Sequence, residues 1–278
     1  MLPYRLLAID IDGTLVNSRD ELTPATRAAL IRAGQAGIQV VLATGRRYSK
    51  TLHLVEPLEI DVPLVTAGGA LVKDPLDHRT LYRAEFAPDL LRQTLAAVDE
   101  WGFDALLCAD TYDERFDFFL GRPDVRSPQL AEYLRLNPGD GRLWPRLLDD
   151  PPQHAFMGFT MGTRDEMLAL ERRLEERLPG QLSMHVVRSP RYTGFMCEIA
   201  PAGVTKWSGV CHLAALWGID EAAICAVGDD VNDIPMIRAA GLGVAMGNAL
   251  PPVKAAADRI APTHDEDGLV QVVEWLLG

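Results

Sequence analysis

The sequence is poor in cysteine and contains no long apolar run. Only four of its 278 residues are cysteine, and none of them forms a C-x-x-C pair. The sparse cysteines argue against a small secreted fold held by disulfides, so we expect free, mostly buried thiols in a reducing compartment. No apolar run approaches the roughly 20 residues that a membrane helix needs. Asp10 and Asp12 also interrupt the N-terminal segment before a signal-peptide core could form. We therefore expect a soluble cytoplasmic protein.

Positive charge is also scarce. The chain has 27 lysines and arginines against 39 aspartates and glutamates, a formal net charge of −12. Nucleic acids and anionic membranes bind proteins largely through lysine and arginine, so both are excluded as expected partners. The same charge repels a phosphorylated metabolite. Any phosphate site must therefore be local, built from a cation, a few basic side chains and backbone N–H groups. The sequence does not indicate how many copies of the chain assemble.

The composition is otherwise that of a globular protein, with 48% apolar and 24% charged residues. Buried strands are predicted at 5–11, 38–43 and 63–66, with helices between them. The first helix is expected to begin at Thr23-Pro24, and a second is expected over 47–55. Strands and helices alternate again after residue 206. This pattern predicts an α/β fold with a Rossmann-like, doubly wound parallel sheet.

The middle of the chain shows a different pattern of helices and strands. It predicts helices at 88–101 and 163–178, several strands, and irregular sequence over 110–152. We expect an inserted α+β domain over 83–195, and a first domain formed by 1–82 and 196–278. Four aromatic residues of the insert are expected to form its core, with the lining of a substrate pocket as the alternative: Tyr112, Phe116, Phe118 and Phe119.

Two carboxylates follow the first predicted strand in Asp10-Ile-Asp12-Gly13-Thr14. In open α/β sheets, ligands bind beyond the carboxyl ends of the strands. Two acids brought into one site repel each other unless a cation lies between them or one is protonated, and a hard divalent ion with oxygen ligands meets that need. Gly13 permits a sharp turn, and Thr14 is expected to cap the exit. The alternative is an ordinary acidic loop.

A second acidic loop follows the predicted strand at 222–227, in Gly228-Asp229-Asp230-Val231-Asn232-Asp233. Asp229 is the obvious further metal ligand, and Asp233 is a candidate to orient a metal-bound water. Taken alone, this loop is equally well explained as a turn or a helix cap.

Two weaker signals suit a phosphate group. Thr44-Gly45-Arg46 follows the second predicted strand, where a hydroxyl and backbone N–H groups can bind phosphate oxygens. A capping threonine with a turn glycine explains this segment equally well. Lys206 begins a predicted helix, and a lone lysine is usually solvated. It stands out because a phosphoryl group needs a fixed positive charge.

In this order, the segments that contain Asp10, Thr44, Lys206 and Asp229 resemble the four motifs of the haloacid dehalogenase superfamily. The segments 243–249 and 265–268 resemble its Cof-type branch. The resemblance covers both ends of the chain and implies a Rossmann-like core with an inserted cap. It also implies a Mg²⁺-dependent phosphatase that acts on small phosphorylated metabolites.

The resemblance also implies roles for single residues. Asp10 would be the nucleophile that forms an aspartyl-phosphate, and Asp12 the general acid and base. Mg²⁺ would be held by Asp10, by Asp12 through its backbone carbonyl, and by Asp229, with Asp233 in support. The phosphoryl or substrate group would be bound by Thr44, Gly45, Arg46, Lys206 and Asn232.

Two positions depart from the branch pattern. Ala67-Gly68-Gly69 stands where the branch usually has Asn-Gly, and Trp207 follows Lys206 where glycine is common. Trp207 is expected to pack in the core. A phosphomutase with the same nucleophile and a non-enzymatic phospho-receiver or binding homologue are the alternatives. Asp12 argues against a receiver, because an acid two residues after the nucleophile speeds hydrolysis of the phosphorylated aspartate.

Overall fold

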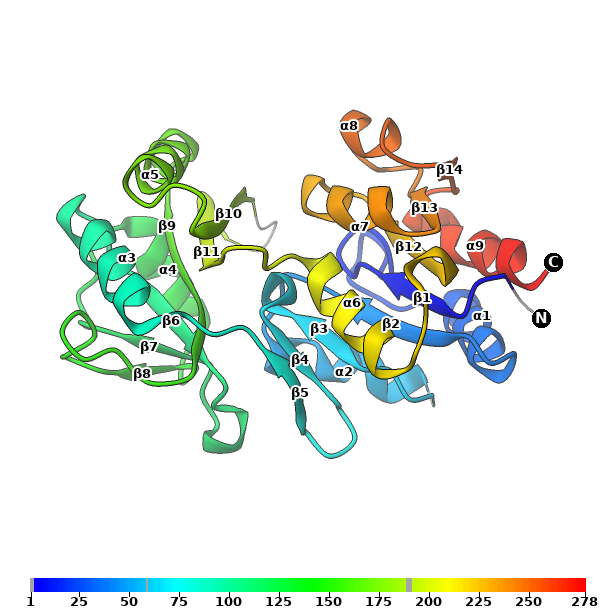
Figure 1. Cartoon of the computed structure of the whole chain (residues 1–278), viewed down its shortest axis with the longest axis horizontal. Coiled ribbons are helices and arrows are strands. Elements are labelled where there is room, and N and C mark those ends of the chain that lie inside the picture. The colour runs from blue at the N-terminus through cyan, green and yellow to red at the C-terminus, as the bar shows by residue number, and fades with distance from the viewer. Residues whose placement is uncertain (1–2, 59, 189–191) are drawn as a thin grey trace. The chain divides into compact units, whose positions relative to one another are not determined.

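The computed structural model describes residues 3–58, 60–188 and 192–278, and Figure 1 shows the arrangement of its elements. The chain divides into two compact units, one made of residues 1–83 and 205–278 and the other of residues 84–204. The expected domain boundaries at 82/83 and 195/196 stay predictions. The second boundary of the units lies later because β11 (Phe195–Pro201) pairs with β9 (Ala155–Gly162) and β10 (Leu182–Val187) of the second unit.

The first unit is built on an eight-stranded sheet in the order β14-β13-β12-β1-β2-β3-β4-β5. Its strands are β1 (Leu6–Ile9), β2 (Gln39–Ala43), β3 (Leu64–Thr66), β4 (Leu71–Lys73), β5 (Thr80–Arg83), β12 (Ile224–Gly228), β13 (Leu242–Ala245) and β14 (Arg259–Ile260). From β14 to β3 the strands are parallel, whereas β4 and β5 are antiparallel additions. The sequence predicted the parallel strands, but we did not foresee β4 or β5.

Helices cover the sheet of the first unit. They are α1 (Pro24–Gln35), α2 (Leu52–Val55), α6 (Lys206–Leu216), α7 (Ile234–Ala239), α8 (Pro251–Lys254) and α9 (Gly268–Leu277). Leu213 of α6 and Met236 of α7 are buried against strand residues such as Leu6, and Trp207 packs on this cluster as expected. The alternate strand residue Leu7 is also fully buried, so both faces of the sheet are covered.

The first helix begins as predicted, because Thr23 accepts a hydrogen bond from the Thr26 backbone and Pro24 opens the helix. The continuous helix predicted over 47–55 is wrong. A 3₁₀ turn at Tyr48–Lys50 is followed by a single α-helical turn, α2. The Thr51 hydroxyl donates to the Tyr48 carbonyl at 2.7 Å, a local bond that competes with regular helix.

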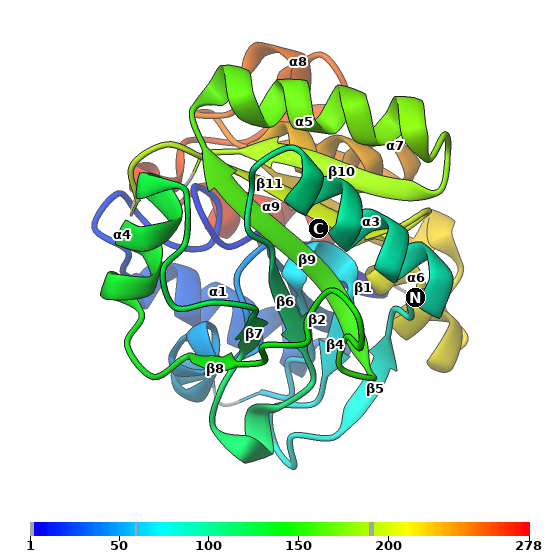
Figure 2. The ribbon, with the colours of Figure 1, turned by 90° about the vertical axis from the view of Figure 1, so that its left-hand side faces the viewer.

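The second unit has a six-stranded sheet in the order β10-β11-β9-β6-β7-β8, antiparallel except between β7 and β8. Its remaining strands are β6 (Leu106–Ala109), β7 (Phe118–Leu120), β8 (Gly141–Leu143), β9 (Ala155–Gly162) and β10 (Leu182–Val187). Its helices are α3 (Pro88–Glu100), α4 (Pro128–Leu136) and α5 (Arg164–Arg177). Figure 2 shows α3 and α5 lying over the strands of this sheet.

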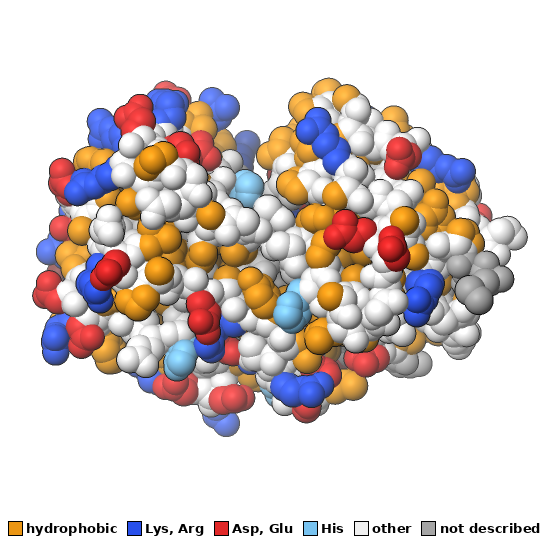
Figure 3. All heavy atoms as spheres, viewed as in Figure 1, with side chains coloured by type: hydrophobic (Ala, Val, Ile, Leu, Met, Phe, Trp, Pro, Cys, Tyr) orange, Lys and Arg blue, Asp and Glu red, His pale blue; other side chains and the backbone are white. Residues whose placement is uncertain are grey.

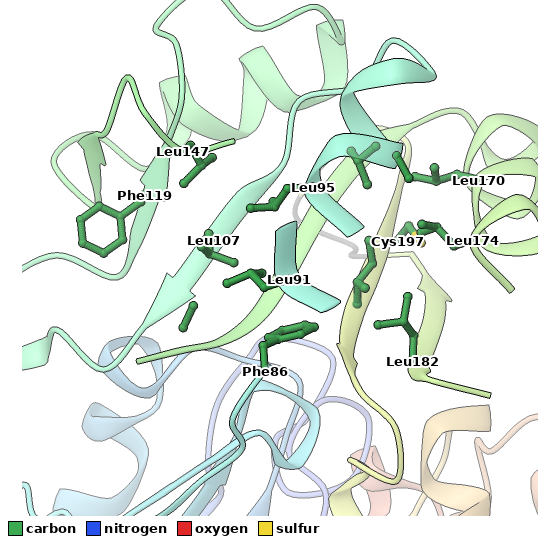
Figure 4. Close-up of a cluster of buried hydrophobic side chains, with 14 of the residues drawn as sticks. Phe86, Leu91, Leu95, Leu107, Phe119, Leu147, Leu170, Leu174, Leu182 and Cys197 are labelled. Atoms are coloured by element: carbon green, nitrogen blue, oxygen red, sulfur yellow. The ribbon is translucent and has the colours of Figure 1, made fainter. Parts of the chain in front are cut away.

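The core of the second unit is apolar. Leu91 and Leu95 of α3 and Leu170 and Leu174 of α5 pack on Leu107 and its neighbours (Figure 4). Three of the four aromatic residues named from the sequence belong to the interior, since Phe116, Phe118 and Phe119 are at most 7% exposed. Tyr112 is only half-buried.

The expectation of irregular sequence over 110–152 is wrong, because β7, α4 and β8 all lie there. The sequence Ser127-Pro128 could have predicted the start of α4, since the Ser127 hydroxyl accepts a hydrogen bond from the Leu130 backbone N–H and Pro128 opens the helix. The short strand β8 depends on tertiary packing instead. A Cβ at Gly141 would lie 2.6 Å from the Phe118 ring, so a side chain there would force the strand away.

Among the described residues, no helix combines the length and apolar character that crossing a bilayer requires. The four cysteines are free thiols, and Cys108, Cys197 and Cys225 are buried, as expected. Figure 3 shows acidic and basic side chains interspersed over one face of the molecule.

Candidate active site

The site lies where the strand order of the first sheet reverses. β1 is flanked by β12 on one side and β2 on the other, with Ile9 beside both Val227 and Leu42. All three strands run in the same direction, so their carboxyl ends meet at one edge. This edge is where open α/β sheets bind ligands. The loops that follow the three strands contain Asp10, Asp229 and Thr44.

Helix α6 brings Lys206 to this edge because two glycines permit a close approach. A Cβ at Gly69 would lie 1.9 Å from the Thr205 carbonyl oxygen, and a Cβ at Gly209 would lie 2.5 Å from Val65. Gly69 also has a φ of +104°, which favours glycine. Gly69 therefore has a structural role, because it lets the start of α6 approach this loop closely.

Lys206 is not a solvated lysine, for it is only 3% exposed. Its Nζ donates to Asp10 Oδ1 at 2.6 Å, to Asp233 Oδ1 at 2.6 Å and to Asn232 Oδ1 at 3.2 Å. Lys206 therefore joins the nucleophile candidate to the acidic loop after β12.

The second oxygen of Asp233 organises that acidic loop. Asp233 Oδ2 accepts from the backbone N–H of Asp229 at 3.0 Å and of Asp230 at 3.1 Å. Gly228 permits this fold-back, since a Cβ there would lie 2.4 Å from the Asp233 carboxyl carbon. Asp233 is fully buried and fixes both Lys206 and the backbone of Asp229.

Asp229 is positioned to bind a cation. Its Oδ1 is buried and has no hydrogen-bond partner among the described residues. Gly13 makes room for it, because a Cβ at Gly13 would lie 2.2 Å from Asp229 Oδ2, and the φ of Gly13 is +77°. One carboxylate oxygen each of Asp10, Asp229 and Asp233 lie within 4.8 Å of one another. We call Asp10, Lys206, Asp229 and Asp233 the strand-end site.

The electrostatics of the strand-end site favour a divalent cation. Three carboxylates face one ammonium group, which leaves an excess of two negative charges when all three are ionised. Burial raises the pKa of Asp10 well above its ordinary value; Asp233 and Asp229 raise it further and Lys206 opposes them. The pKa of Asp229 is raised to about 7, first by burial and then by Asp233 and Asp230. Burial opposes the charge of Lys206, but Asp10 and Asp233 outweigh it and raise its pKa. The buried, unpartnered oxygen of Asp229 and this excess charge fit Mg²⁺.

The side chain of Asp12 is not among the three carboxylates that could hold a metal, although its charge contributes to the raised pKa of Asp229. The Asp12 side chain is 48% exposed and forms an ion pair with Arg46, which also contacts Asp20. We expected Arg46 to meet substrate. In this structure its guanidinium is bound between two carboxylates. Metal binding by Asp12 through its backbone carbonyl stays a prediction.

Thr44 is buried at 1% exposure in the loop after β2, and its hydroxyl accepts from the Arg46 backbone N–H at 3.0 Å. A hydroxyl that accepts can also donate, so this bond leaves Thr44 capable of binding a phosphate oxygen. Gly45 is half-buried in the same loop. Thr14 does not cap the exit from β1 as we expected, since its hydroxyl is buried without a partner among the described residues.

Sequence reasoning missed the contribution of Asn248. Its Nδ2 donates to the Gly13 carbonyl at 2.8 Å and to Asp229 Oδ2 at 3.3 Å, and its Oδ1 accepts from the His264 backbone at 3.0 Å. Asn248 thus connects the loops after β1 and β12. The only sequence signal was its place in the 243–249 pattern.

The family model for haloacid dehalogenase-like hydrolases matches residues 7–273. The chain is a haloacid dehalogenase-like hydrolase. Phosphatase YwpJ of Bacillus subtilis is 29% identical over 294 residues, which cover 98% of this chain and 100% of that protein. Pyridoxal phosphate phosphatase YbhA of Escherichia coli is 27% identical over 285 residues, 97% of either chain. A crystal structure of a haloacid dehalogenase-like hydrolase from Bacteroides thetaiotaomicron superposes with a TM-score of 0.78 at 28% identity and covers 98% of this chain and 99% of its own.

These matches confirm the resemblance read from the motifs, including the Cof-type branch, and extend it over the insert. This hydrolase is a phosphatase, that is, a phosphoric monoester hydrolase. The fold is also confirmed as a mainly parallel core sheet with a separate inserted sheet. The roles of the individual residues stay predictions.

Proposed function

We propose that the protein is a Mg²⁺-dependent phosphatase that hydrolyses small phosphorylated metabolites through an aspartyl-phosphate on Asp10. The observation that carries this proposal is the buried contact between Asp10 and Lys206, 2.6 Å long, beside Asp229 and Asp233. A carboxylate attacks an already negative phosphorus only if positive charge surrounds the reacting atoms. Lys206 supplies one such charge within hydrogen-bond reach of the nucleophile.

In the first step, one oxygen of the Asp10 carboxylate forms a bond to phosphorus while the bond from phosphorus to the leaving oxygen breaks. Asp12 gives its proton to that leaving oxygen, so the alcohol departs neutral. In the second step, Asp12 takes a proton from water, which attacks phosphorus and releases inorganic phosphate and Asp10. Because a carboxylate has two oxygens, Asp10 can keep its bond to Lys206 through Oδ1 as the other oxygen reacts.

The phosphoryl oxygens would be held by Lys206, the Thr44 hydroxyl, the Gly45 backbone and Asn232. Lys206 and Asn232 already contact each other at 3.2 Å, so one substrate oxygen can lie near both. Thr44 comes from the neighbouring strand end. These groups are buried or half-buried, which strengthens their interaction with a charged ligand.

The metal would be held by Asp10, Asp229 and the Asp12 backbone carbonyl, with Asp233 in support. Bound Mg²⁺ supplies positive charge that lets the carboxylates and the phosphoryl group share one site. Asp233 would act mainly by holding the Asp229 backbone, because both of its oxygens already accept hydrogen bonds from protein groups.

The substrate would be a small phosphorylated metabolite, such as a sugar phosphate or pyridoxal phosphate. The name of YbhA identifies pyridoxal phosphate as the substrate of a relative that is 27% identical. The insert over 83–195 would select the substrate, because the strand-end site addresses the phosphoryl group that all such compounds share.

A phosphate-release screen over phosphorylated metabolites tests the proposal. With Mg²⁺ we expect release from a subset of compounds, and no release in excess chelator. Asp10→Asn should lower kcat on the order of a thousandfold or more with the fold intact, because an amide is a poor nucleophile. Asp89→Asn is the matched control, since Asp89 is an 84% exposed carboxylate on α3. Near-normal turnover by Asp10→Asn would refute the nucleophile. Transfer of the phosphoryl group to a second hydroxyl, without phosphate release, would instead identify a phosphomutase.

A further inference from the structure

Arg46 holds the carboxylate of Asp12 at two points. Its Nε donates to Asp12 Oδ2 at 2.9 Å, and its Nη2 donates to Asp12 Oδ1 at 2.7 Å. Two parallel hydrogen bonds from a planar guanidinium fix both the place and the orientation of a carboxylate. The Arg46 side chain is only 8% exposed, whereas the Asp12 side chain is 48% exposed. A buried arginine therefore anchors an exposed acid.

The anchor is itself fixed. Nη2 of Arg46 also donates to Asp20 Oδ1 at 2.6 Å. The backbone of Arg46 is tied on both sides, because its N–H donates to the Thr44 hydroxyl at 3.0 Å and its carbonyl accepts from the Ala67 N–H at 3.0 Å. Asp12 is thus connected through Arg46 to the loops after β2 and β3.

Asp20 is held in a turn that suits this contact. Its φ is +61°, in the left-handed region that aspartate tolerates better than most residues. The turn is closed by Asn17, whose Oδ1 accepts from the backbone N–H of Arg19 at 2.9 Å and of Glu21 at 3.1 Å. The Asp20 carboxylate therefore faces Arg46 from a constrained backbone.

These contacts argue against Arg46 as a primary phosphate ligand. Three of its five N–H donors are directed at carboxylates, and the two carboxylates outweigh its charge, although Nη1 is buried without a partner among the described residues. The proposed Mg²⁺ would offset the carboxylates around Lys206, whereas no cation is proposed for the two side-chain carboxylates that Arg46 pairs with.

We propose that Arg46 is a positioning residue that acts through Asp12, and that Asp20 holds Arg46 in place. The inference rests on the proposed function, in which Asp12 protonates the leaving oxygen. Transfer of that proton needs the Asp12 carboxyl at a defined place, and a displacement of about 1 Å lowers rates strongly. Arg46 and Asp20 set that place.

The nature of the leaving group separates this role from phosphate binding. The alkoxide of an alkyl phosphate, such as a sugar phosphate found in the screen, is a poor leaving group, so its departure depends on protonation. The nitrophenolate of para-nitrophenyl phosphate leaves readily without it. A residue that acts through Asp12 should therefore matter more for the alkyl ester, whereas a phosphate ligand should matter equally for both.

The experiment measures kcat and KM on both esters for Asp12→Asn, Arg46→Gln, Arg46→Lys and Asp20→Asn. Arg19→Gln is the control, because Arg19 neighbours Asp20 but pairs with Glu21 and is 76% exposed. Asp12→Asn should lose roughly a hundredfold in kcat/KM, which reports the first step, on the alkyl ester and far less on the aryl ester; loss of the base of the second step should lower kcat for both esters. Arg46→Gln should show the same selective loss, roughly tenfold or more. The double variant Asp12→Asn with Arg46→Gln should be no slower on the alkyl ester than Asp12→Asn alone.

Arg46→Lys retains the charge but not the paired hydrogen bonds, so it should share the selective loss. If thermal melting shows that Arg46→Gln does not fold, Arg46→Lys and Asp20→Asn test the inference in its place. Equal losses on both esters with a raised KM would overturn the inference and make Arg46 a phosphate ligand. If Asp12→Asn itself shows no selectivity, the general acid of the proposed function fails, and the inference fails with it. If Asp12→Asn loses more activity on the alkyl ester than on the aryl ester but the Arg46 variants do not, the inference about Arg46 fails while the proposed function stands.

Discussion

Lys206, Asp10 and Asp233 are each at most 4% exposed, as deeply buried as Leu107 and Leu174 in the core of the second unit. The two regions are stabilised in different ways. In the strand-end site, buried charges hold one another, and three carboxylates surround one ammonium group. In the second unit, α3 and α5 bury leucines against a sheet, as Figure 4 shows. The first arrangement depends on charged partners and, in the proposed function, on a bound ion, whereas the second depends on apolar surface removed from water.

Lys206→Met should give the largest effect, because it removes the ammonium group that donates hydrogen bonds to both Asp10 and Asp233. Breaking a buried charge pair by removing one partner costs about 3–5 kcal/mol in the free energy of unfolding. Turnover should also fall on the order of a hundredfold or more, since the phosphoryl group loses its fixed positive charge. Urea unfolding and phosphate release measure the two effects.

Mg²⁺ should return part of the stability that Lys206→Met loses, because the uncompensated carboxylates then have a cation. An unfolding free energy of Lys206→Met that Mg²⁺ does not raise would show that the ion does not bind at these carboxylates.

Leu174→Ala tests the other region. Leu174 is fully buried in the core of the second unit, and a leucine-to-alanine change in such a core costs about 2–5 kcal/mol. We expect this loss in urea unfolding to be the same with and without Mg²⁺, since no charge is involved. A loss that Mg²⁺ repairs would contradict the division between a charged and an apolar region.

The same division shows what the sequence could predict. Acids after buried strands predicted the loops at Asp10 and Asp229, because strand order and direction determine where carboxyl ends meet. Lys206 was ambiguous by itself, since nothing local shows that Gly69 and Gly209 admit its helix so closely. The pairing of Arg46 with Asp12 and Asp20 was likewise unreadable, because it joins two loops through side-chain contacts.

Short elements outside the alternating strand–helix pattern were the least predictable part of the fold. β4, β7 and β8 have three residues each, too few to show an alternating pattern. Pairing with neighbouring strands makes them regular, as β8 shows through the contact of Gly141 with Phe118. Longer elements with local signals, such as the capping box at Thr163 and Glu166, were predicted correctly.

The pH dependence of Mg²⁺ binding should again distinguish the strand-end site from the apolar core of the second unit. The pKa of Asp229 is raised to about 7 by burial and by Asp233 and Asp230, well above the value of 3.8 expected in the unfolded chain. As the pH rises from about 4 to 7, the Asp229 carboxyl loses its proton in the unfolded chain but keeps it in the folded chain. Asp229 therefore lowers the stability of the metal-free protein over this range. Mg²⁺ needs the carboxylate, so its apparent Kd should rise roughly tenfold for each pH unit below 7.

Thermal melting with and without Mg²⁺ between pH 5 and 8 checks this expectation. The increase in Tm caused by Mg²⁺ should be small at pH 5 and grow towards pH 8. Asp229→Asn should abolish the increase, while Leu174→Ala should preserve it at every pH. A Mg²⁺ effect that is constant across this range would mean that no proton competes with the ion.

Asn248→Ala should have the smallest of these effects. Asn248 donates to Asp229 Oδ2 at 3.3 Å and to the Gly13 carbonyl at 2.8 Å, so it orients the acid and the loop after β1 without carrying charge. Loss of such a supporting group weakens metal binding by roughly tenfold. Isothermal titration with Mg²⁺ measures the change. Asn137→Ala is the matched control, since Asn137 is a buried asparagine of the second unit that donates to the Tyr133 carbonyl at 2.8 Å. Equal Mg²⁺ affinity in the two variants would mean that Asp229 keeps its place without Asn248, and that the buried charges of the strand-end site position one another.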